Sequence, residues 1–354
     1  MGLASLRVTR VTRSLKNIAL SMLHAGGAFG FARRLARRRL LVLTYHHVLP
    51  RPAEPAGERL PNVLYVDEFA QQLEYLTRHC HVVSGDELRA HLQGRPLPPH
   101  PVLLTFDDGY RNNYRYAFPL LKQHGACAVF FLTSGFIGDR RRRLWFDRLD
   151  AAMAAAPDAV ASWLRTHKKL AGLSLDECRR IVKHLPARAR DALVTGAERA
   201  AGRMAPTPGS KDRVEPMSWE EVREMAEAGM LIGAHTATHQ ILADATAADV
   251  RTEIATSRAA IEARTGRTCW CFSYPNGEAA DFRDVDVRML KACGFECAFT
   301  QVPGLVDSRS NPYTLPRLAV PSAADFRVFL TRVTGLLPLL TSSTTGIRRW
   351  ARAS

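Results

Sequence analysis

The chain of 354 residues carries 49 Lys and Arg against 34 Asp and Glu, a formal net charge of +15, and 46% of its residues are hydrophobic. With 23% charged residues, 23 Gly and 20 Pro, this composition excludes disordered and fibrous proteins. The length and apolar fraction predict one large folded domain or two small ones with a buried core.

The seven cysteines are odd in number and do not form a regular disulfide framework, so we predict free, mostly buried thiols. Four of them form two close pairs that could make a four-thiolate zinc site (Cys269, Cys271, Cys293 and Cys297). Neither pair has the two-residue gap that is typical of structural zinc ligands, and we therefore favour the free thiols.

Residues 1–39 form a basic N-terminal segment, which holds nine Lys and Arg and no acidic residue. The uncharged stretch between Lys16 and Arg33 falls short of the roughly 20 apolar residues that a spanning helix needs. We predict an amphipathic helix that lies on an anionic membrane surface. A cleaved signal peptide and a plain solvated helix are the alternatives.

The segment from 40 to 325 alternates short apolar runs with helical patterns, which indicates a parallel α/β architecture and predicts a barrel. The predicted strands are 40–45, 102–106, 126–132 and 231–234, and the predicted helices are 67–79 and 116–124. From about 140 to 216 the sequence is rich in Ala and charged residues and predicts a helical insertion in the barrel. Residues 326–354 predict a helical basic tail, a second candidate for surface binding.

Two adjacent carboxylates, Asp107 and Asp108, follow the strand 102–106 directly. Such a pair is costly beside a buried strand unless a positive charge lies close by, and a metal ion is the natural partner. One carboxylate can then bind the ion while the other takes a proton from bound water.

His235 and His239 follow the strand 231–234, and their spacing puts them on one face of a helical turn, where they can bind one ion. Together with a carboxylate of the first cluster, they would give three protein ligands and an open position for water. That pattern is typical of a catalytic rather than a structural zinc site.

The third cluster, Phe272 to Gly277, contains Tyr274, Pro275 and Asn276, which we predict to contact the substrate. By itself it predicts only a strand followed by a turn. Tyr274 and Trp145 are candidates for stacking on sugar rings, although each is more often a core or rim aromatic residue.

The run Thr-Phe-Asp-Asp-Gly, then His-Thr-x-x-His, then Tyr-Pro-x-Gly resembles the polysaccharide deacetylase family (NodB-homology domain, carbohydrate esterase family 4). The resemblance covers residues 40–325 except the helical stretch. It implies an α/β fold, a distorted, incomplete (β/α) barrel of the NodB-homology type with a helical insertion, and metal-dependent hydrolysis of N-acetyl groups on sugars. By this resemblance Asp108, His235 and His239 match the metal ligands and Asp107 the general base. The backbone N–H of Tyr110 is the expected oxyanion donor.

The sequence departs from the family pattern at the general acid, because no His occurs after His239. His46 and His47, at the end of the first strand, are the upstream candidates, and we predict His46. First and last strands are neighbours in a barrel, so a His on either reaches the same place. The Tyr-His-x-Val element there resembles the exopolysaccharide-associated branch of the family.

A second departure is the absence of the Arg that precedes the third motif in many members. Arg317 could orient Asp107 instead, with a surface salt bridge as the equal alternative. If Arg317 pairs with Asp107, its replacement should lower kcat sharply and leave folding intact.

The leading hypothesis is a metal-dependent deacetylase of N-acetylated polysaccharide in a bacterial exopolysaccharide or cell-envelope pathway. The metal would be Zn²⁺, with Co²⁺, Ni²⁺ or Mn²⁺ as alternatives. The competing hypotheses are a deacetylase or deformylase of a lipid-linked sugar and an inactive carbohydrate-binding module. Nucleic acid is not an expected partner, because the positive charge is terminal and no motif accompanies it. The expected location is cytoplasmic or at the inner face of the cytoplasmic membrane, with a periplasmic location as the alternative.

Overall fold

The computed structural model describes residues 28–52, 62–167, 170, 175–202, 210–320, 322 and 325–335. Most of the predicted basic N-terminal segment and of the basic C-terminal tail therefore lies outside the described residues. Within the described part of the chain, no helix is both long enough and apolar enough to cross a membrane.

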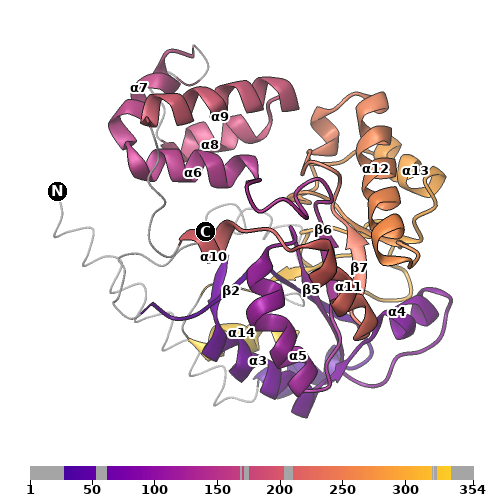
Figure 1. The fold of residues 1–354 in the computed structure, drawn as a ribbon. Helices are drawn as coiled ribbons and strands as arrows, with labels where there is room; N and C mark the ends of the chain where they lie inside the picture. Colours follow the sequence, from indigo (N-terminus) through magenta and orange to yellow (C-terminus); the bar gives the residue numbers. More distant parts are fainter. Residues whose placement is uncertain are drawn as a thin grey trace.

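A curled parallel sheet forms the centre of the fold (Figure 1). Its eight strands follow the order β10-β1-β5-β6-β7-β8-β9, with β4 paired to β5, and every pairing is parallel. This confirms the predicted distorted, incomplete barrel. The strands are β1 (Leu41–Tyr45), β4 (His81–Val82), β5 (Pro101–Phe106), β6 (Val129–Leu132), β7 (Leu231–Ala234), β8 (Cys271–Ser273), β9 (Cys297–Phe299) and β10 (Leu318–Ala319). A separate parallel pair is formed by β2 (His47–Leu49) and β3 (Val63–Tyr65).

Most strand residues are apolar and buried because both faces of the sheet are covered. All six residues of β5 are buried, and alternate side chains belong to two separate apolar clusters. Leu103 packs with Val42, Phe131 and Phe299 in the smaller cluster, whereas Leu104 and Phe106 pack in the larger one. Thr105 and Asp107 continue the alternation of Leu103. The strand thereby directs Asp107 to the same side as that smaller cluster.

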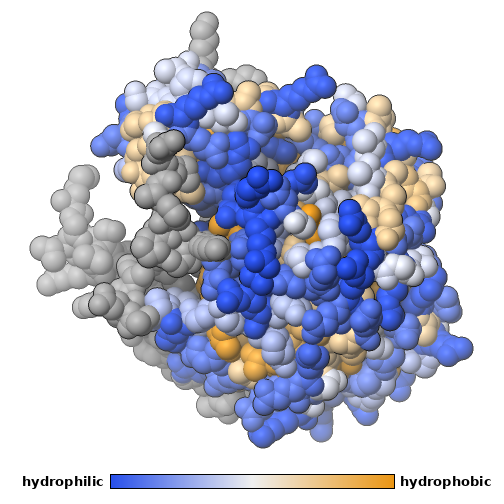
Figure 2. Space-filling model, viewed as in Figure 1, coloured by the Kyte–Doolittle hydropathy of each residue, from blue (hydrophilic) through white to orange (hydrophobic). Residues whose placement is uncertain are grey.

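Helices connect the strands and cover the outside of the sheet (Figure 1). Figure 2 shows that mostly hydrophilic residues cover the face seen in this view, as expected for helices that turn their apolar sides inward. These helices are α2 (Ala28–Leu35), α3 (Val66–His79), α4 (Gly85–Leu92), the π-helix η1 (Asn113–Ala117), α5 (Phe118–Gln123), α11 (Trp219–Glu227), the 3₁₀ helix η2 (Leu242–Asp244), α12 (Ala247–Thr265), α13 (Asp284–Ala292) and α14 (Phe326–Val333).

Capping explains several of the helix starts. The hydroxyls of Ser84 and Ser218 each accept a hydrogen bond from the amide of the third helical residue. The Glu side chain at that third position accepts a hydrogen bond from the backbone N–H of the serine. The predicted helix at 116–124 is only partly correct, because η1 precedes α5 there. The predicted strand at 126–132 begins only at Val129.

The segment between β6 and β7 contains a helical bundle that stands apart from the sheet (Figure 1). It has its own apolar core, formed by residues such as Leu149, Val160, Leu193 and Val194. Its helices are α6 (Trp145–Ala155), α7 (Pro157–Arg165), α8 (Leu175–Lys183) and α9 (Ala187–Ala201), followed by the short α10 (Ser210–Val214).

Candidate metal centre

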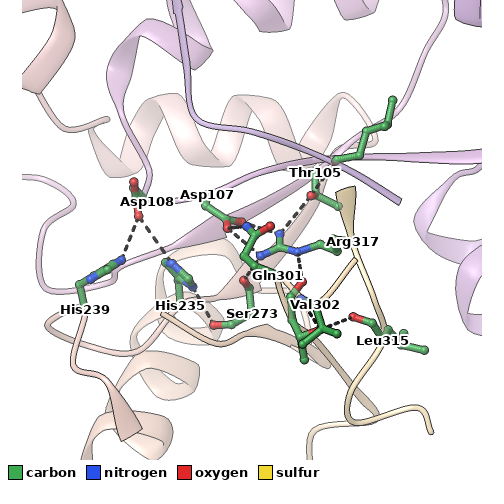
Figure 3. A network of polar contacts seen from close by, with 12 residues as sticks. Thr105, Asp107, Asp108, His235, His239, Ser273, Gln301, Val302, Leu315 and Arg317 are labelled. Atoms are coloured by element: carbon green, nitrogen blue, oxygen red, sulfur yellow. Dashed lines mark hydrogen bonds and ion pairs between the residues drawn. The ribbon is translucent and has the colours of Figure 1, made fainter. Parts of the chain in front are cut away.

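Three buried side chains from two loops converge at the carboxyl ends of β5 and β7 (Figure 3). The Oδ1 atom of Asp108 lies 3.5 Å from Nε2 of His235 and 3.3 Å from Nε2 of His239. One ligand atom from each residue lies within 4.8 Å of the other two. Among the described residues, this is the single group of three or more His, Cys, Asp or Glu side chains that could hold a metal ion.

Unusual backbone conformations bring these side chains together. Asp108 has φ 78° and His239 has φ 57°, both in the left-handed region that non-glycine residues rarely adopt. Each such residue costs about 1–3 kcal/mol and persists where the surrounding structure holds it, often at functional sites. The predicted helical turn between His235 and His239 is wrong, since this segment has no helix and Thr236 also has a positive φ of 63°.

The hydrogen bonds of His235 show that the site suits a cation. Its Nδ1 lies 2.7 Å from the carbonyl oxygen of Ser273, so Nδ1 carries a proton. Burial lowers the pKa of His235 to about 4, so the ring is neutral at pH 7. Its unprotonated Nε2 therefore carries a lone pair. This lone pair faces an oxygen of Asp108. Burial acts to raise the pKa of Asp108, but the pKa is lowered overall, chiefly by the interaction with His239. Two acceptors face each other, and a bound cation relieves this arrangement.

Asp107 points away from the metal ligands and is held by Arg317 (Figure 3). Nη1 and Nη2 of Arg317 lie 2.8 and 2.7 Å from the two carboxylate oxygens. Arg317 also donates to the hydroxyls of Thr105 and Ser273 at 3.1 and 2.7 Å and to the carbonyl of Thr300 at 3.0 Å. Burial acts to raise the pKa of Asp107, but the opposing interactions, of which the charge of Arg317 is the largest, leave this pKa lowered. Asp107 is therefore a carboxylate at neutral pH.

The alternative of a surface salt bridge for Arg317 is wrong, because its side chain is fully buried. The expectation that its replacement leaves folding intact also changes. Removing one partner of a buried, fully hydrogen-bonded ion pair leaves an uncompensated charge and costs about 3–5 kcal/mol.

His46 and His47 point to different surroundings, as neighbouring residues of an extended segment do. His46 is half-buried, and its ring is close enough to act electrostatically on both Asp107 and Asp108. His47 is buried, its Nδ1 lies 3.3 Å from Nδ2 of Asn112, and burial lowers its pKa to about 3. Of the two, only His46 combines exposure to solvent with proximity to both carboxylates.

Tyr110 links the loop that follows β5 (the catalytic loop, residues 107–110) to the helical insertion. Its hydroxyl donates a 2.7 Å hydrogen bond to Oδ2 of Asp147 on α6, and both side chains are buried. The backbone of Tyr110 forms an antiparallel bridge with Pro216, in which Arg111 and Met217 supply the ladder N–H groups. The role of the Tyr110 N–H as oxyanion donor stays a prediction.

The predicted stacking of Tyr274 on a sugar is wrong. Tyr274 is 1% exposed, its ring stacks on Phe282 at 4.2 Å between centroids, and its hydroxyl donates to the carbonyl of Tyr313. Pro275 is buried and Asn276 is half-buried in the turn that follows β8, and their contact with substrate stays a prediction.

Trp145 is half-buried and packs against the core of the insertion. Its neighbour Phe146 lies beside the metal site, with its ring centroid 5.2 Å from that of His239. The substrate contact predicted for Trp145 stays a prediction. The four cysteines considered for zinc are free thiols, as predicted.

Sequence reasoning missed three residues that support the site. Ser273 contacts both His235 and Arg317, Gln301 donates to Asp107 at 3.4 Å, and Asp147 anchors Tyr110. The positions of Ser273 and Gln301 at the carboxyl ends of β8 and β9 were an available signal, since parallel barrels place chemistry there. No sequence signal marks Asp147, because it lies in a helix 37 residues after Tyr110.

Comparison with known proteins agrees with this geometry. Residues 94–298 match the profile of the family described as polysaccharide deacetylase. YxkH of Bacillus subtilis (strain 168) is 20% identical over 219 residues, which cover 62% of this chain and 51% of YxkH. The poly-beta-1,6-N-acetyl-D-glucosamine N-deacetylase of Escherichia coli (strain K12) is 34% identical over 84 residues, which cover 23% of this chain and 12% of that protein. The matches thus span about half of YxkH and 12% of the Escherichia coli protein.

Two solved structures share the fold. The Streptococcus pyogenes deacetylase PplD in complex with acetate superposes with a TM-score of 0.56 at 18% identity, covering 84% of this chain and 99% of PplD. IcaB from Ammonifex degensii superposes with a TM-score of 0.55 at 22% identity, covering 84% of this chain and 97% of IcaB.

Proposed function

The chain belongs to the polysaccharide deacetylase family, and on this premise we propose that it is a metal-dependent hydrolase of N-acetyl groups on the amino sugars of a polysaccharide. An exopolysaccharide is the proposed substrate class. Supporting it are the match to the Escherichia coli poly-beta-1,6-N-acetyl-D-glucosamine N-deacetylase and the Tyr-His-x-Val element at the end of β1.

One observation carries the proposal: the two adjacent carboxylates interact with different groups. Asp108 faces the imidazoles of His235 and His239, while Asp107 is paired with Arg317. This division lets one carboxylate hold a cation and the other remain a free base in the same site. An inactive carbohydrate-binding module has no need of such costly buried charges, so we favour an enzyme over that alternative.

Asp108, His235 and His239 would hold a divalent ion, for which two imidazoles and one carboxylate suit Zn²⁺ and also Co²⁺, Ni²⁺ or Mn²⁺. When bound, such an ion lowers the pKa of water and polarises an amide carbonyl. Asp107 is the proposed base that takes the proton of the attacking water, and Arg317 keeps it ionised and oriented.

Breaking the C–N bond of the acetamide requires a proton for the departing amine. His46 is the proposed proton donor, because its half-buried imidazole interacts electrostatically with both Asp107 and Asp108. The N–H of Tyr110 is the proposed donor to the oxygen of the carbonyl under attack.

A lipid-linked amino sugar, deacetylated or deformylated, is the second candidate substrate. The basic residues of 1–39 favour it, since they would hold the protein against anionic lipid. Peripheral contact with such a membrane, from the cytoplasmic side or alternatively from the periplasm, belongs to the same proposal.

The test is metal content together with amine release from N-acetylglucosamine oligomers, for the native chain and for Asp108→Ala. We expect the native protein to bind about one divalent ion and to release amine, and Asp108→Ala to lose both. A native chain that binds no divalent ion and releases no amine from oligomeric, polymeric or lipid-linked substrates would leave the binding module as the better hypothesis.

A further inference from the structure

We propose that the outer face of α2 is a docking surface for an anionic lipid bilayer and that it holds the active site facing away from that bilayer. This face consists of Phe31, Arg34 and Leu35 on α2, together with Arg37 and Arg38 in the turn that follows the helix. The inference extends the proposed function by naming the surface and by favouring a polymer over a lipid-linked sugar as substrate.

The face presents apolar side chains that no part of the described structure covers. Phe31 is 67% exposed and Leu35 is 56% exposed, and they are the two most exposed large hydrophobic residues among those described. They lie four residues apart and therefore on one side of the helix. Large apolar side chains exposed together indicate an interaction site, whereas single ones are common on any protein.

Positive charge lies next to these apolar side chains. Arg34 lies on α2, Arg37 and Arg38 lie in the turn that follows the helix, and all three side chains are exposed. The described structure records no acidic partner for any of them. Exposed Phe and Leu side chains, flanked by Arg side chains that have no acidic partner among the described residues, match the headgroup region of a bilayer, which offers an apolar phase beneath anionic groups. A nucleic acid would satisfy only the charges.

The opposite side of α2 is fixed to the barrel, so the docking face has a defined orientation. Ala32 is buried, and Gly335, after α14, approaches Ala36 so closely that a Cβ at that glycine would lie 2.8 Å from the Ala36 side chain. Arg33 donates to the carbonyl of His79 at the end of α3. The amide of His100 donates to the carbonyl of Arg37 at 2.7 Å, directly before β5 begins.

These contacts place α2 at the amino-terminal ends of β1 and β5, while Asp107 and Asp108 follow the carboxyl end of β5. Six residues of β5 separate the two ends, which corresponds to about 20 Å at about 3.3 Å per residue. A protein docked through α2 therefore keeps its site roughly this far from the lipid. A sugar attached to a lipid of the same bilayer leaflet would have to span this distance, whereas a polymer in solution reaches the site directly.

The experiment measures co-sedimentation of the full chain with phosphatidylcholine vesicles and with vesicles that also contain phosphatidylglycerol. The variants are F31S/L35S, which removes the apolar anchors, and R34Q/R37Q/R38Q, which removes the charges. R140Q/R141Q/R142Q is the matched control, because it removes an equal charge from exposed arginines elsewhere. Amine release from a soluble N-acetylated oligomer is measured in parallel, with and without saturating vesicles.

We expect salt-sensitive binding to the anionic vesicles only. Each Arg contributes about a fivefold change in affinity, so R34Q/R37Q/R38Q should weaken binding about a hundredfold. F31S/L35S should weaken it at least about tenfold, and the control should remain within a few-fold of the native chain. Native activity on the soluble oligomer should be the same with vesicles as without them, because the site stays open.

Three results of the binding measurements would overturn the docking surface. The native chain could fail to bind anionic vesicles, or both α2 variants could bind like the native chain. Binding could also depend on charge alone, with F31S/L35S unaffected and duplex DNA competing fully, which would favour a general polyanion site. Vesicle binding without amine release would instead reject the proposed function and leave the docking surface intact. Activity that is suppressed by vesicles would reject the orientation.

Discussion

Asp107 and Asp108 are adjacent in sequence, yet each has a different set of charged partners. Arg317 holds both oxygens of Asp107, and the two imidazoles lie next to Asp108. Strand alternation explains the division, because Asp107 continues the inward pattern of β5 while Asp108 leaves the strand with a positive φ. Gly109 follows, also with positive φ, where a Cβ would lie 2.5 Å from Ile137. The local sequence Asp-Asp-Gly is thereby tied to one backbone path.

Arg317 should affect both stability and the pH dependence of activity. Arg317→Ala leaves the Asp107 charge buried and unpaired, so the free energy of unfolding should fall by about 3–5 kcal/mol. Arg317→Lys keeps a charge but loses the bidentate pair. The pKa of Asp107 should then rise, and the acid limb of kcat/KM should move to higher pH, because a base must be deprotonated to act.

Denaturant unfolding and pH–rate profiles check this prediction. Arg89→Ala is the control, since Arg89 also pairs with a carboxylate, Glu296, but is 44% exposed at its side chain and should cost about 1 kcal/mol or less. An acid limb that stays in place in Arg317→Lys would separate Arg317 from the ionisation of Asp107.

His46 and His47 offer a matched pair of variants. We expect His46→Gln to lower kcat about 10²–10⁴-fold, which is the usual contribution of a general acid. The metal content should stay unchanged. His47→Gln should change kcat much less, because His47 is buried, bonded to Asn112 and neutral. Equal losses of kcat in the two variants would point to a shared structural role.

At the scale of the elements, the helical insertion contacts the catalytic loop through a buried acid. Asp147 on α6 accepts from Tyr110, and burial raises its pKa to about 7. The folded state therefore binds a proton more tightly than the unfolded state does. The stability that this proton provides is fully present below pH 4 and is lost as the pH rises toward 7.

Asp147→Asn should remove this dependence in metal-free protein. Relative to the variant, the native chain should lose on the order of 2–4 kcal/mol of unfolding free energy between pH 4 and pH 7. Urea unfolding across this range measures the difference, and Asp158→Asn, at an exposed position of α7, controls for the loss of a charge. Parallel curves for the native chain and Asp147→Asn would contradict a raised pKa.

Metal binding should be visible in the stability of the whole molecule, because the three ligands come from segments more than 120 residues apart along the chain. A ligand that binds only the folded state adds about 4 kcal/mol at a thousand times its Kd. Zn²⁺ added to chelator-treated protein should therefore raise the Tm by several degrees. Asp108→Ala should show no such rise, while Asp158→Ala, an exposed acid, should respond like the native chain. An equal rise in all three proteins would locate the metal elsewhere.

The sequence by itself determined the parallel barrel and its helical insertion. It also determined that the candidate base Asp107 and the candidate metal ligands Asp108, His235 and His239 lie at the ends of strands. Apolar strand runs and motif spacing are local properties, and they are readable in one dimension. The tertiary structure alone decided that Arg317 meets Asp107, from which it lies 210 residues away, that Asp147 meets Tyr110, and that Tyr274 is enclosed by Phe282. It also decided that α2 and the catalytic loop lie at opposite ends of β5. Such contacts depend on how distant segments pack, and no spacing along the chain encodes them.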